Sequence, residues 1–494
     1  MYLVTSEQMR CFDHHTIETC KVPAIVLMDH AGKSVAEAVA EYGVSSIVIA
    51  CGKGNNGGDG WLAARWLRHM GYAVRVVSAV DPDTELSNDA HRAFEMAVAV
   101  GVPWQCYTEG CLAEMKPAVY VDALLGTGCT RALAGKWASM VREMNETKAP
   151  IVAVDIPTGV NASTGEVYDV AVQATETIAM AFEKLGTAVT PGANHAGQVR
   201  VVDIGITAPL PEGMAVYVDP RSHGQGWGER GVLSHKGTYG RCGIVVGQMQ
   251  GAAMLAAAGA ARAGAGLVVL SCDELVSPAV APDYVVRKEA DPLVALADCQ
   301  SVVIGPGLGK GQALVRKALT ASKADTMRSW RGVIDADGLA DLIEEGQLLQ
   351  IGDEWVLTPH PKECALLLGW TTAQVQAKRI SAATQLAAQT GAIVLLKGYR
   401  TVIARPDGQI RINPTGNASL AVGGSGDLLA GIIGSLIAQG LNGFAAASLG
   451  AWLHGRAGEL AGAALTPVST TASDIEKYIS RAIMTFFDIV QAEL

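Results

Sequence analysis

The feature that most constrains the fold is a repeated alternation of short β-branched runs with helical stretches rich in Ala and Gly. In the first part of the chain the runs are SIVIA ending at Ala50, VRVVSA from Val74, AVYVDAL from Ala118 and IVAVDIP from Ile151. Each run leads into a loop that contains glycine. This alternation predicts right-handed crossovers and a mostly parallel sheet, with ligands bound beyond the carboxyl ends of the strands. We therefore expect an α/β fold.

The alternation lapses between about Ile206 and Tyr239, where Pro and Gly are frequent and neither helical nor strand periodicity persists. It resumes with GIVVG, GLVVLS, SVVIGPG, GVIDADG, WVLTPH and AIVLLKG, and it ends in a long Gly- and Ala-rich helical region. A chain of 494 residues has room for two large α/β domains. The sequence thus predicts two dissimilar domains, residues 1–213 and 225–494.

The composition excludes several classes of protein. Hydrophobic residues make up 49% and charged residues 17% of the chain, which is too apolar for intrinsic disorder. The net charge of −10 and the lack of a basic run argue against nucleic acid or an anionic membrane as the main partner. The two most apolar stretches, Gly251 to Leu270 and Leu428 to Leu441, are too interrupted or too short to cross a bilayer, so they predict buried helices.

The start of the chain carries Glu7, Arg10 and Asp13, where a signal peptide needs an unbroken apolar core. The ten cysteines are scattered without a CxxC pair and are interpreted as buried thiols. Among the histidines only His14 and His15 are adjacent, so a structural zinc site is not expected. We expect a cytoplasmic protein that forms a homo-oligomer.

The first segment with chemical potential is CGKGNNGGDG, which starts at Cys51 and precedes a helix predicted to begin near Gly60. Glycines at such a turn let backbone N–H groups and the positive end of the helix dipole approach an anion. A tight strand–helix connection without a ligand is the alternative. The candidate residues are Gly54, Asn55, Asn56, Gly57, Gly58 and Asp59.

Two aspartates directly follow buried runs: Asp122 in VYVDALLGTG and Asp155 in IVAVDIPTG. A carboxylate at the carboxyl end of a parallel strand faces the ligand crevice, where partial burial raises its pKa and suits it to proton transfer. A helix cap or a turn is the alternative role for either residue.

In the second half, NPTGNASLAVGGSGDLLAG places Gly423, Gly424, Ser425, Gly426 and Asp427 at the start of a long apolar helix. Free N–H groups at this helix start form an anion hole for a transferred phosphate, and an acid beside it can take a proton from an attacking hydroxyl. The alternative is that the acid only stabilises the helix dipole.

The segments GNNGGDG, VDALLGTG and VDIPTGVNASTG, in this order, resemble the epimerase domain of NAD(P)H-hydrate repair enzymes over about the first 210 residues. The resemblance implies a Rossmann-like α/β/α sandwich that binds a hydrated nicotinamide dinucleotide and a potassium ion. It implies potassium ligation by Asn56, Asp122 and Thr158 and proton transfer by Asp155. The residues implied to contact the hydrate are Asn55, Asn56, Gly57, Gly58, Asp59, Gly126, Thr127, Gly128, Cys129, Thr130, Arg131, Ala132 and Asp155.

The segment GGSGD followed by LLAG, together with GPGLG, TPHPKE and KGYRT, resembles the ribokinase-like ADP-dependent NAD(P)H-hydrate dehydratases from about residue 230 to near 490. The resemblance implies Asp427 as the catalytic acid–base group, with ADP and Mg²⁺ as cofactors. The residues implied to bind the nucleotide are Lys397, Gly398, Tyr399, Arg400, Thr401 and Gly426. Those implied to contact the hydrate are Ala253, Gly309, His360 and Asp427.

Two departures from the family pattern are visible. Lys362 stands where the family usually has glycine, and it could strain a turn or add a charge near phosphate. Ser419, Leu420 and Val422 alter the approach to the predicted anion hole without replacing Gly426 or Asp427. We expect activity to survive both changes.

Together these features predict a bifunctional enzyme. One domain equilibrates the R and S forms of hydrated NADH and NADPH (NADHX and NADPHX), and the other dehydrates the S form with ADP, giving AMP and phosphate. A kinase for the hydroxyl of a vitamin or sugar is the alternative among enzymes. A non-catalytic nucleotide-binding or interaction module is the alternative for the first domain.

Overall fold

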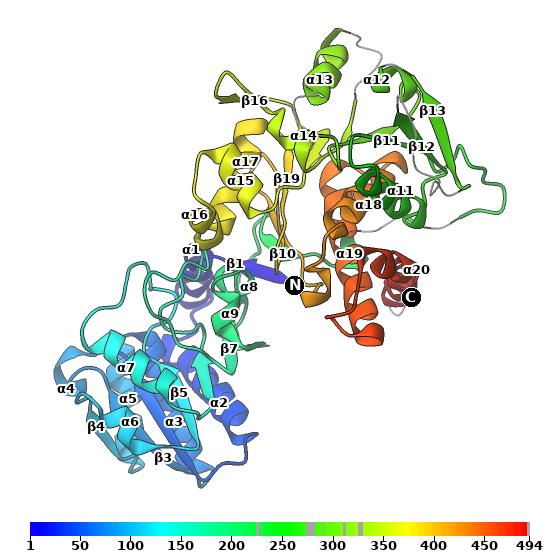
Figure 1. Ribbon diagram of the computed structural model, residues 1–494. Helices are drawn as coiled ribbons and strands as arrows, with labels where there is room; N and C mark the ends of the chain where they lie inside the picture. The colour runs from blue at the N-terminus through cyan, green and yellow to red at the C-terminus, as the bar shows by residue number, and fades with distance from the viewer. Residues whose placement is uncertain are drawn as a thin grey trace. The chain divides into compact units, whose positions relative to one another are not determined.

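The computed structural model describes residues 1–223, 227–228, 230–272, 282–289, 291–309, 313–324 and 330–491 (Figure 1). It divides the chain into two units, Tyr2–Ala215 and Val216–Leu494, the second including Met1. We call them the first unit and the second unit.

The sheet of the first unit is parallel throughout, with the strand order β4-β3-β2-β5-β6-β7-β9. The strands are β2 (Ser46–Cys51), β3 (Ala73–Ser78), β4 (Trp104–Cys106), β5 (Val119–Ala123), β6 (Ile151–Val154), β7 (Glu176–Met180) and β9 (Gln198–Val202). The register pairs Ala50 with Asp122 and Asp122 with Ala153, so the polar strand ends lie at one edge. The predicted parallel sheet is confirmed.

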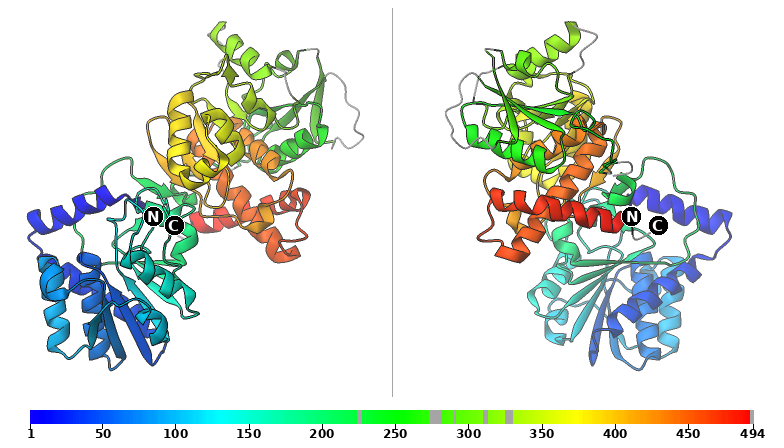
Figure 2. Two further views of the ribbon diagram at one scale, coloured as in Figure 1. Left: turned by 60° about the vertical axis from the view of Figure 1, so that its left-hand side comes forward. Right: turned by 90° about the vertical axis from the view of Figure 1, so that its right-hand side faces the viewer.

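Helices cover both faces of this sheet (Figure 2). Ile47 and Ile49 of β2 pack with α2, α3 and α5, whereas Val48 and Ala50 pack with α6 and α7 on the opposite face. The alternation follows from the strand period of two. The remaining elements of this unit are β1 (Tyr2–Val4), α1 (Ser6–His14), a π-helix (His15–Thr19), α2 (Ala24–Ala40), α3 (Asn55–His69), α4 (Pro82–Glu85), α5 (Asn88–Ala99), α6 (Cys111–Met115), α7 (Lys136–Glu146), β8 (Glu183–Lys184), α8 (Leu185–Ala188) and α9 (Ala193–Ala196).

In the second unit a parallel stretch runs in the order β13-β12-β11-β14-β15-β18-β19, and β20 and β21 extend it in antiparallel fashion. Val216 and Tyr217 of β10 (Ala215–Tyr217) pair in parallel with β21. The strands are β11 (Arg241–Val245), β12 (Leu267–Cys272), β13 (Tyr284–Lys288), β14 (Ser301–Ile304), β15 (Gly332–Ile334), β18 (Trp355–Leu357), β19 (Ile393–Leu396), β20 (Val402–Ala404) and β21 (Ile410–Ile412). Each run predicted from the sequence forms one of these strands.

The helices of the second unit pack on this sheet, and α18 and α19 supply much of the core. They are α10 (Pro220–His223), α11 (Gln250–Arg262), α12 (Pro292–Ala295), α13 (Leu314–Ala324), α14 (Asp337–Ala340), α15 (Pro361–Leu368), α16 (Thr372–Ala377), α17 (Arg379–Thr390), the 3-10 turn Ala418–Leu420, α18 (Ser425–Ala438), α19 (Gly443–Leu465) and α20 (Ala472–Gln491). A small hairpin joins β16 (Ile343–Glu344) to β17 (Gln347–Leu348). None of the helices described is long and apolar enough to cross a membrane.

One of the two apolar stretches differs from its prediction. The stretch from Gly251 to Leu270 is not a single buried helix, because α11 ends at Arg262 and β12 begins at Leu267. Gly264, with φ of +97°, lies in the turn between them, where a glycine ends a helix without strain. The other stretch forms α18 as predicted, and this helix is buried on all sides from Leu428 to Ala438.

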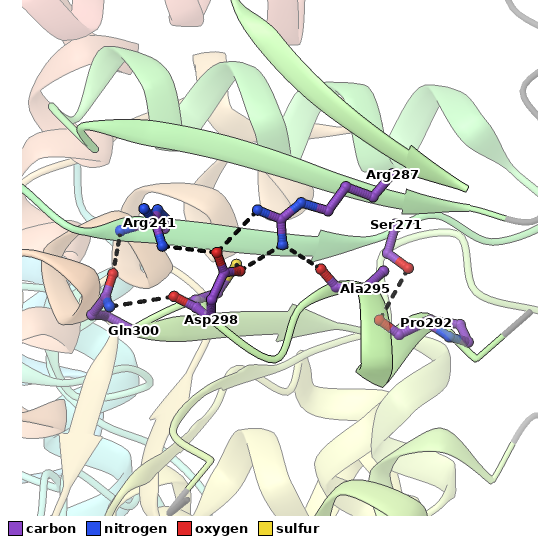
Figure 3. A network of polar contacts seen from close by, with 8 residues as sticks. Arg241, Ser271, Arg287, Pro292, Ala295, Asp298 and Gln300 are labelled. Carbon is purple, nitrogen blue, oxygen red and sulfur yellow. Dashed lines mark hydrogen bonds and ion pairs between the residues drawn. The ribbon is translucent and has the colours of Figure 1, made fainter. Parts of the chain in front are cut away.

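A polar network holds the loop after α12 to the neighbouring strands (Figure 3). The carboxylate of Asp298 accepts hydrogen bonds from Arg241 Nη1 at 2.8 Å and Arg287 Nη2 at 3.1 Å. Arg287 Nη1 also donates to the carbonyl of Ala295 at 2.7 Å. The hydrogen bond from Arg287 lowers the pKa of Asp298. The network connects β11 and β13 through the side chains of Arg241 and Arg287.

Close backbone packing joins α11 to α18. A Cβ on Gly431 would collide with the carbonyl oxygen of Ala256, and a Cβ on Gly259 would collide with the carbonyl oxygen of Leu428. The two backbones are therefore in direct contact, and this contact fixes the position of α18 against α11.

Gly431→Ala should therefore destabilise the second unit. Overpacking against backbone costs about 1–3 kcal/mol or more, because the neighbouring carbonyl cannot move without shifting a helix. Urea unfolding followed by tryptophan fluorescence measures the change. Gly251→Ala, in the first turn of the same helix pair where a Cβ meets nothing, is the control and should be neutral or slightly stabilising. Equal effects of the two substitutions would contradict this account of the packing.

Candidate active sites

The Gly- and Asn-rich segment of the first unit lies where β2 meets α3. The helix begins at Asn55 with Gly54 as its N-cap, and not near Gly60 as predicted from the sequence. The prediction was wrong because tertiary packing overrides the poor helix propensity of Asn and Gly. A Cβ on Gly52 would collide with the carbonyl oxygen of Leu124, so the loops after β2 and β5 are in backbone contact.

Asp122, at the end of β5, is fully buried. Its carboxylate accepts hydrogen bonds from the backbone N–H and the hydroxyl of Thr158, both at 2.8 Å, and from the backbone N–H of Leu124 at 3.2 Å. Burial raises the pKa of Asp122 to about 6, although these hydrogen bonds lower it. The carboxylate is therefore held in place by neutral donors.

Asn56 lies beside this pair. The side chain is buried, its Nδ2 has no hydrogen-bond partner among the described residues, and its Oδ1 would lie 3.3 Å from a Cβ on Gly126. Thr158 also accepts a hydrogen bond from the backbone N–H of Leu125 at 2.9 Å, which links it to the same loop. The structure thus brings the predicted ligands Asn56, Asp122 and Thr158 to one loop.

Asp155 is held in an unusual conformation after β6. Its φ is +67°, a left-handed value that Asp tolerates better than most residues. Its Oδ1 accepts hydrogen bonds from the backbone N–H of Met180 at 3.1 Å and from the ammonium of Lys184. The side chain of Asp155 is 14% exposed and that of Lys184 is fully buried. No described residue donates a hydrogen bond to the second oxygen of Asp155, so this oxygen can take another partner.

Lys184 was not found from the sequence. Its Nζ also donates to the carbonyls of Met180 at 2.9 Å and Phe182 at 3.0 Å, so its three protons are all engaged. Lys184 therefore acts on Asp155 and has no proton to offer a ligand. The only sequence signal was a single lysine inside the apolar stretch AFEKLGTAV.

The ion pair of Asp155 and Lys184 influences the pKa values of two further acids. Burial raises the pKa of Asp13 to about 6, Asp155 raises it further, and Lys184 lowers it. The pKa of Asp59 is raised well above its usual value, first by burial and then by Asp155 and Asp13. Three carboxylates thus lie near one ammonium, and repulsion between the acids disfavours the ionised forms of Asp13 and Asp59. Asp13, on α1, was not among the predicted site residues.

The other predicted residues of the first unit lie around these acids. Gly57, Gly58 and Asp59 are in the first turns of α3, and Asn55 is exposed at the helix start. The loop after β5 carries Gly126 to Ala132. In it, the carbonyl of Thr127 accepts a hydrogen bond from Ser6 Oγ at 3.0 Å, and Cys129 is buried while Gly128 and residues 130–132 are exposed.

The second unit holds a cavity of about 780 Å³ at the start of α18. Its lining has two parts. The charged part consists of Asp335, His360, Glu363, Lys397, Gly426 and Asp427. The neutral part consists of Asn413, Thr415, Gly416, Asn417, Ala418, Leu420, Ala451, His454 and Gly455.

The charged part is organised around Lys397, at the end of β19. Its ammonium lies 2.8 Å from Asp335 Oδ1 and would lie 3.2 Å from a Cβ on Gly426, in the first turn of α18. Burial lowers the pKa of Lys397, but Asp335, Glu363 and Asp427 outweigh it and raise this pKa above its usual value. Burial and Asp335 raise the pKa of Asp427 to about 6. A cation beside the positive end of a helix suits an anionic ligand.

His360 caps α15. Its Nδ1 accepts hydrogen bonds from the backbone N–H groups of Lys362 and Glu363, both at 3.1 Å, and the Glu363 side chain accepts from the His360 N–H at 2.7 Å. Lys362 lies exposed in the first helical turn and has no left-handed φ. The glycine that it replaces is not needed for the backbone, so Lys362 does not strain the turn.

The structure assembles most of the predicted residues of the second site. His360, Lys397, Gly398, Tyr399, Thr401, Gly426 and Asp427 all line the cavity. Ala253 is buried in α11, the backbone N–H of Gly309 donates to Asp337 at 3.0 Å, and Arg400 has a φ of +56°; these three residues are not in the cavity lining.

Several lining residues were not predicted from the sequence, among them Asp335, Glu363, Asn413 and His454. Asp335 carries the same signal as Asp122 and Asp155, an acid after a buried strand, and could have been found in GVIDADG. Glu363 follows His360 within TPHPKE. Asn413 and His454 carry no recognisable signal, because each lies among residues that are otherwise typical of a loop or a buried helix.

Comparisons with known proteins match both units. Residues 24–186 match the family model described as YjeF-related protein N-terminus, and residues 242–481 match the model described as NAD(P)H-hydrate dehydratase. The bifunctional NAD(P)H-hydrate repair enzyme Nnr of Moorella thermoacetica is 38% identical, covering 93% of this chain and 92% of that protein. The Escherichia coli protein of the same name is 34% identical, covering 88% of this chain and 84% of its own.

A solved structure also matches. The ADP/ATP-dependent NAD(P)H-hydrate dehydratase of Bacillus subtilis, co-crystallised with ATP and Mg²⁺, is 30% identical to this chain, with a TM-score of 0.48. The match covers 55% of this chain and 98% of that chain.

The buried His454 generates a pH prediction. Burial lowers its pKa from 6.5 to about 4, so between these values the unfolded chain binds a proton that the folded chain does not. The stability of the second unit should therefore fall as the pH drops from about 6.5 to 4, with a contribution of about 3 kcal/mol from this residue. His454→Gln should remove that contribution.

The measurement is urea unfolding of the wild type and the variant at pH 7, 5.5 and 4. The raised pKa of Asp427 has the opposite sign, since its protonation favours the folded state at low pH. Because Asp427 is present in both proteins, its contribution cancels in the difference. A difference between the two proteins that does not change with pH would contradict the prediction.

Proposed function

The chain belongs to the family of bifunctional NAD(P)H-hydrate repair enzymes, and we propose that the acid cluster of the first unit carries the epimerisation of its hydrates and the cavity of the second unit carries their dehydration. The enzyme interconverts the R and S forms of NADHX and NADPHX and dehydrates the S form to NADH or NADPH at the expense of ADP. The observation that carries the assignment of residues is that each unit places acids of raised pKa beside one lysine at the carboxyl ends of its strands.

For epimerisation the ring nitrogen of the hydrate expels hydroxide, and water returns from either face. Asp155 is the proton carrier in this proposal. Its Oδ1 is occupied by Lys184 and Met180, which leaves Oδ2 to hold or release a proton. General acid–base help of this kind contributes about 10²–10⁴ in rate. The raised pKa values of Asp13 and Asp59 support this role, because they place further carboxyls that bind protons more readily than a free aspartate beside Asp155.

The hydrate binds beside these acids in our proposal. Asn55, Asn56 and Gly57 to Asp59 form the helix start that faces it, and Gly126 to Ala132 form the opposite loop. Close backbone contact between the loops after β2 and β5 supports a rigid cradle.

Potassium fits the residues proposed to hold it. The buried Asn56 offers an amide oxygen on the side of Gly126, Asp122 is a buried carboxylate held by neutral donors, and Thr158 contributes a hydroxyl oxygen. Oxygen donors of this kind suit a hard cation. When bound, the ion supplies positive charge that favours the ionised form of Asp122 and fixes the loop that carries Gly126.

In the second unit Lys397 to Thr401 and Gly426 bind ADP, and Ala253, Gly309, His360 and Asp427 contact the hydrate. Asp427 takes the proton of the ring hydroxyl as its oxygen attacks the β-phosphorus, which releases AMP. The ring nitrogen then expels phosphate, a better leaving group than hydroxide, and the resulting cationic ring loses a proton from the neighbouring carbon to restore the dihydropyridine. The N–H groups at the start of α18 and the Lys397 ammonium stabilise the transferring phosphoryl group. Mg²⁺, when bound with ADP, neutralises phosphate charge.

The two sites can be separated with crossed variants. Asp427→Ala should lower dehydration by about 10²-fold or more and leave epimerisation intact, whereas Asp155→Asn should lower epimerisation and leave dehydration of the S form intact. A mixture of R and S hydrates with ADP gives the readout, because NADH absorbance reports dehydration and chromatography separates the epimers. Wild type should convert the mixture completely, and Asp155→Asn should stop once the S form is used.

Asp169→Asn and Asp407→Asn are matched controls, because both aspartates are exposed partners of surface arginines. They should leave both activities unchanged. Loss of both activities in either of the crossed variants would contradict the assignment of one site to each unit.

Potassium should stabilise the first unit. Replacing LiCl by KCl at constant ionic strength should raise the unfolding temperature of this unit by about 5 °C, because an ion that binds only the folded state shifts the equilibrium toward it. Differential scanning calorimetry measures the shift. Thr158→Ser keeps the hydroxyl and should keep the shift, whereas Asn56→Ala should abolish it. An unchanged shift in Asn56→Ala would overturn the proposed ligand set.

A further inference from the structure

A buried arginine lies against the segment proposed to bind ADP. Arg379, the first residue of α17, is 1% exposed and does not line the cavity. Its Nη2 donates hydrogen bonds to the carbonyls of Leu396 at 2.9 Å and Lys397 at 3.1 Å, and its Nη1 donates to Gln376 Oε1 at 2.9 Å. Two of these hydrogen bonds therefore reach the end of β19, where Lys397 enters the cavity lining.

The guanidinium of Arg379 is charged, yet its acceptors are neutral. Burial lowers its pKa to about 10, which leaves the side chain positive at neutral pH. Among the described residues, the guanidinium donates only to two backbone carbonyls and one side-chain amide. Burying a cation in this way destabilises the folded state, because neutral acceptors recover only part of its hydration energy. Stability alone therefore does not explain why a cation lies here.

The hydrogen bond to the Lys397 carbonyl orients the peptide unit between Lys397 and Gly398. This peptide is trans, so its N–H points in the direction opposite to its carbonyl. Because the carbonyl points to Arg379, the N–H of Gly398 is directed away from Arg379, and Gly398 is an exposed residue of the cavity lining. No described residue accepts a hydrogen bond from this N–H. It is an open donor in the peptide that follows Lys397.

Gly398 fits against Arg379 because it has no side chain. A Cβ on Gly398 would lie 2.9 Å from Nη2 and 3.0 Å from Nη1 of Arg379, and the φ of Gly398 is +142°. Neither the space nor the backbone conformation suits another residue. The carbonyl of Gly398 is also held, since it accepts a hydrogen bond from the hydroxyl of Thr401 at 2.8 Å. The guanidinium is thus packed directly against the proposed nucleotide segment.

We propose that Arg379 is a positioning residue that holds the N–H of Gly398 and the ammonium of Lys397 toward the phosphates of ADP. The inference rests on the proposed nucleotide site. The backbone N–H of Lys397 donates to the carbonyl of Pro359 at 2.9 Å, so with Arg379 on its carbonyl both backbone polar groups of Lys397 are fixed. Donors that are already oriented bind an anion with little reorganisation of the protein.

Steady-state kinetics of the full-length enzyme with ADP and the S hydrate test this role, with NADH absorbance as the readout. Arg379→Met removes the donors, and Arg379→Lys keeps a cation on a side chain that is one bond shorter. Each variant should raise the KM for ADP by about 10-fold or more, because the N–H of Gly398 is no longer held toward a charged ligand. The KM for the hydrate should not change.

A double variant tests whether Arg379 acts through the peptide of Gly398. Gly398→Ala alone should raise the KM for ADP, since its Cβ collides with the guanidinium. Adding Arg379→Lys to Gly398→Ala should then raise this KM further by much less than about 10-fold, because residues that act on one another are not additive. Effects that multiply independently would contradict the proposal.

Gln376→Ala is the matched control. Gln376 is an exposed residue of α16, and its replacement removes the acceptor of Nη1 while both hydrogen bonds to the end of β19 stay in place. This variant should keep the wild-type KM for ADP, which separates the loss of the carbonyl contacts from a general disturbance around Arg379.

The outcomes distinguish the two levels of the proposal. If wild type does not use ADP at all, the proposed function of the cavity fails. If wild type uses ADP and the Arg379 variants keep its KM, the function stands and this inference is wrong. A parallel rise of the KM for ADP and the KM for the hydrate would give Arg379 a general structural role and overturn it as well. If Arg379→Met does not fold, Arg379→Lys decides, and failure of both to fold would overturn the positioning role.

Discussion

Both candidate sites depend on a lysine ammonium that carboxylates hold in a partly or fully buried position. In the first unit Lys184 is fully buried and gives its three protons to Asp155 and two carbonyls. In the second unit Lys397 pairs with the buried Asp335. An ion pair of this kind does little for stability, because desolvation offsets attraction. Its effect is local: each lysine places a positive charge beside acids whose pKa burial raises to about 6, and the lysine partly offsets that rise.

Backbone contact between glycines and neighbouring carbonyls sets the positions of these charges. In the first unit Gly52 meets the loop after β5, and in the second Gly431 meets α11. Neither contact admits a Cβ. The start of α3 and the start of α18 are thereby fixed relative to strands that come from distant parts of the chain, which is what places backbone N–H groups and acids at one edge of each sheet.

The sequence predicted the features that depend on residues close together in the chain. Buried β-branched runs gave the parallel strands, and an acid after such a run gave Asp122 and Asp155. The features it missed are set by partners far along the chain: Asp155 and Lys184 are 29 residues apart, and Asp335 and Lys397 are 62 apart. His454 was missed for the same reason, since nothing in its own helix distinguishes a histidine that lines a cavity from one packed in a core. The early start of α3 was not predicted, because tertiary packing outweighs the low helix propensity of its first residues.

The left-handed backbone at Asp155 has a consequence for how this residue can vary. Most side chains pay about 1–2 kcal/mol to adopt that conformation, whereas Gly, Asn and Asp adopt it readily. A substitution of Asp155 can therefore affect two separate properties, the backbone conformation and the negative charge. Replacement by alanine would change both properties at once. Replacement by asparagine changes only one, because it preserves the shape of the turn and removes the negative charge.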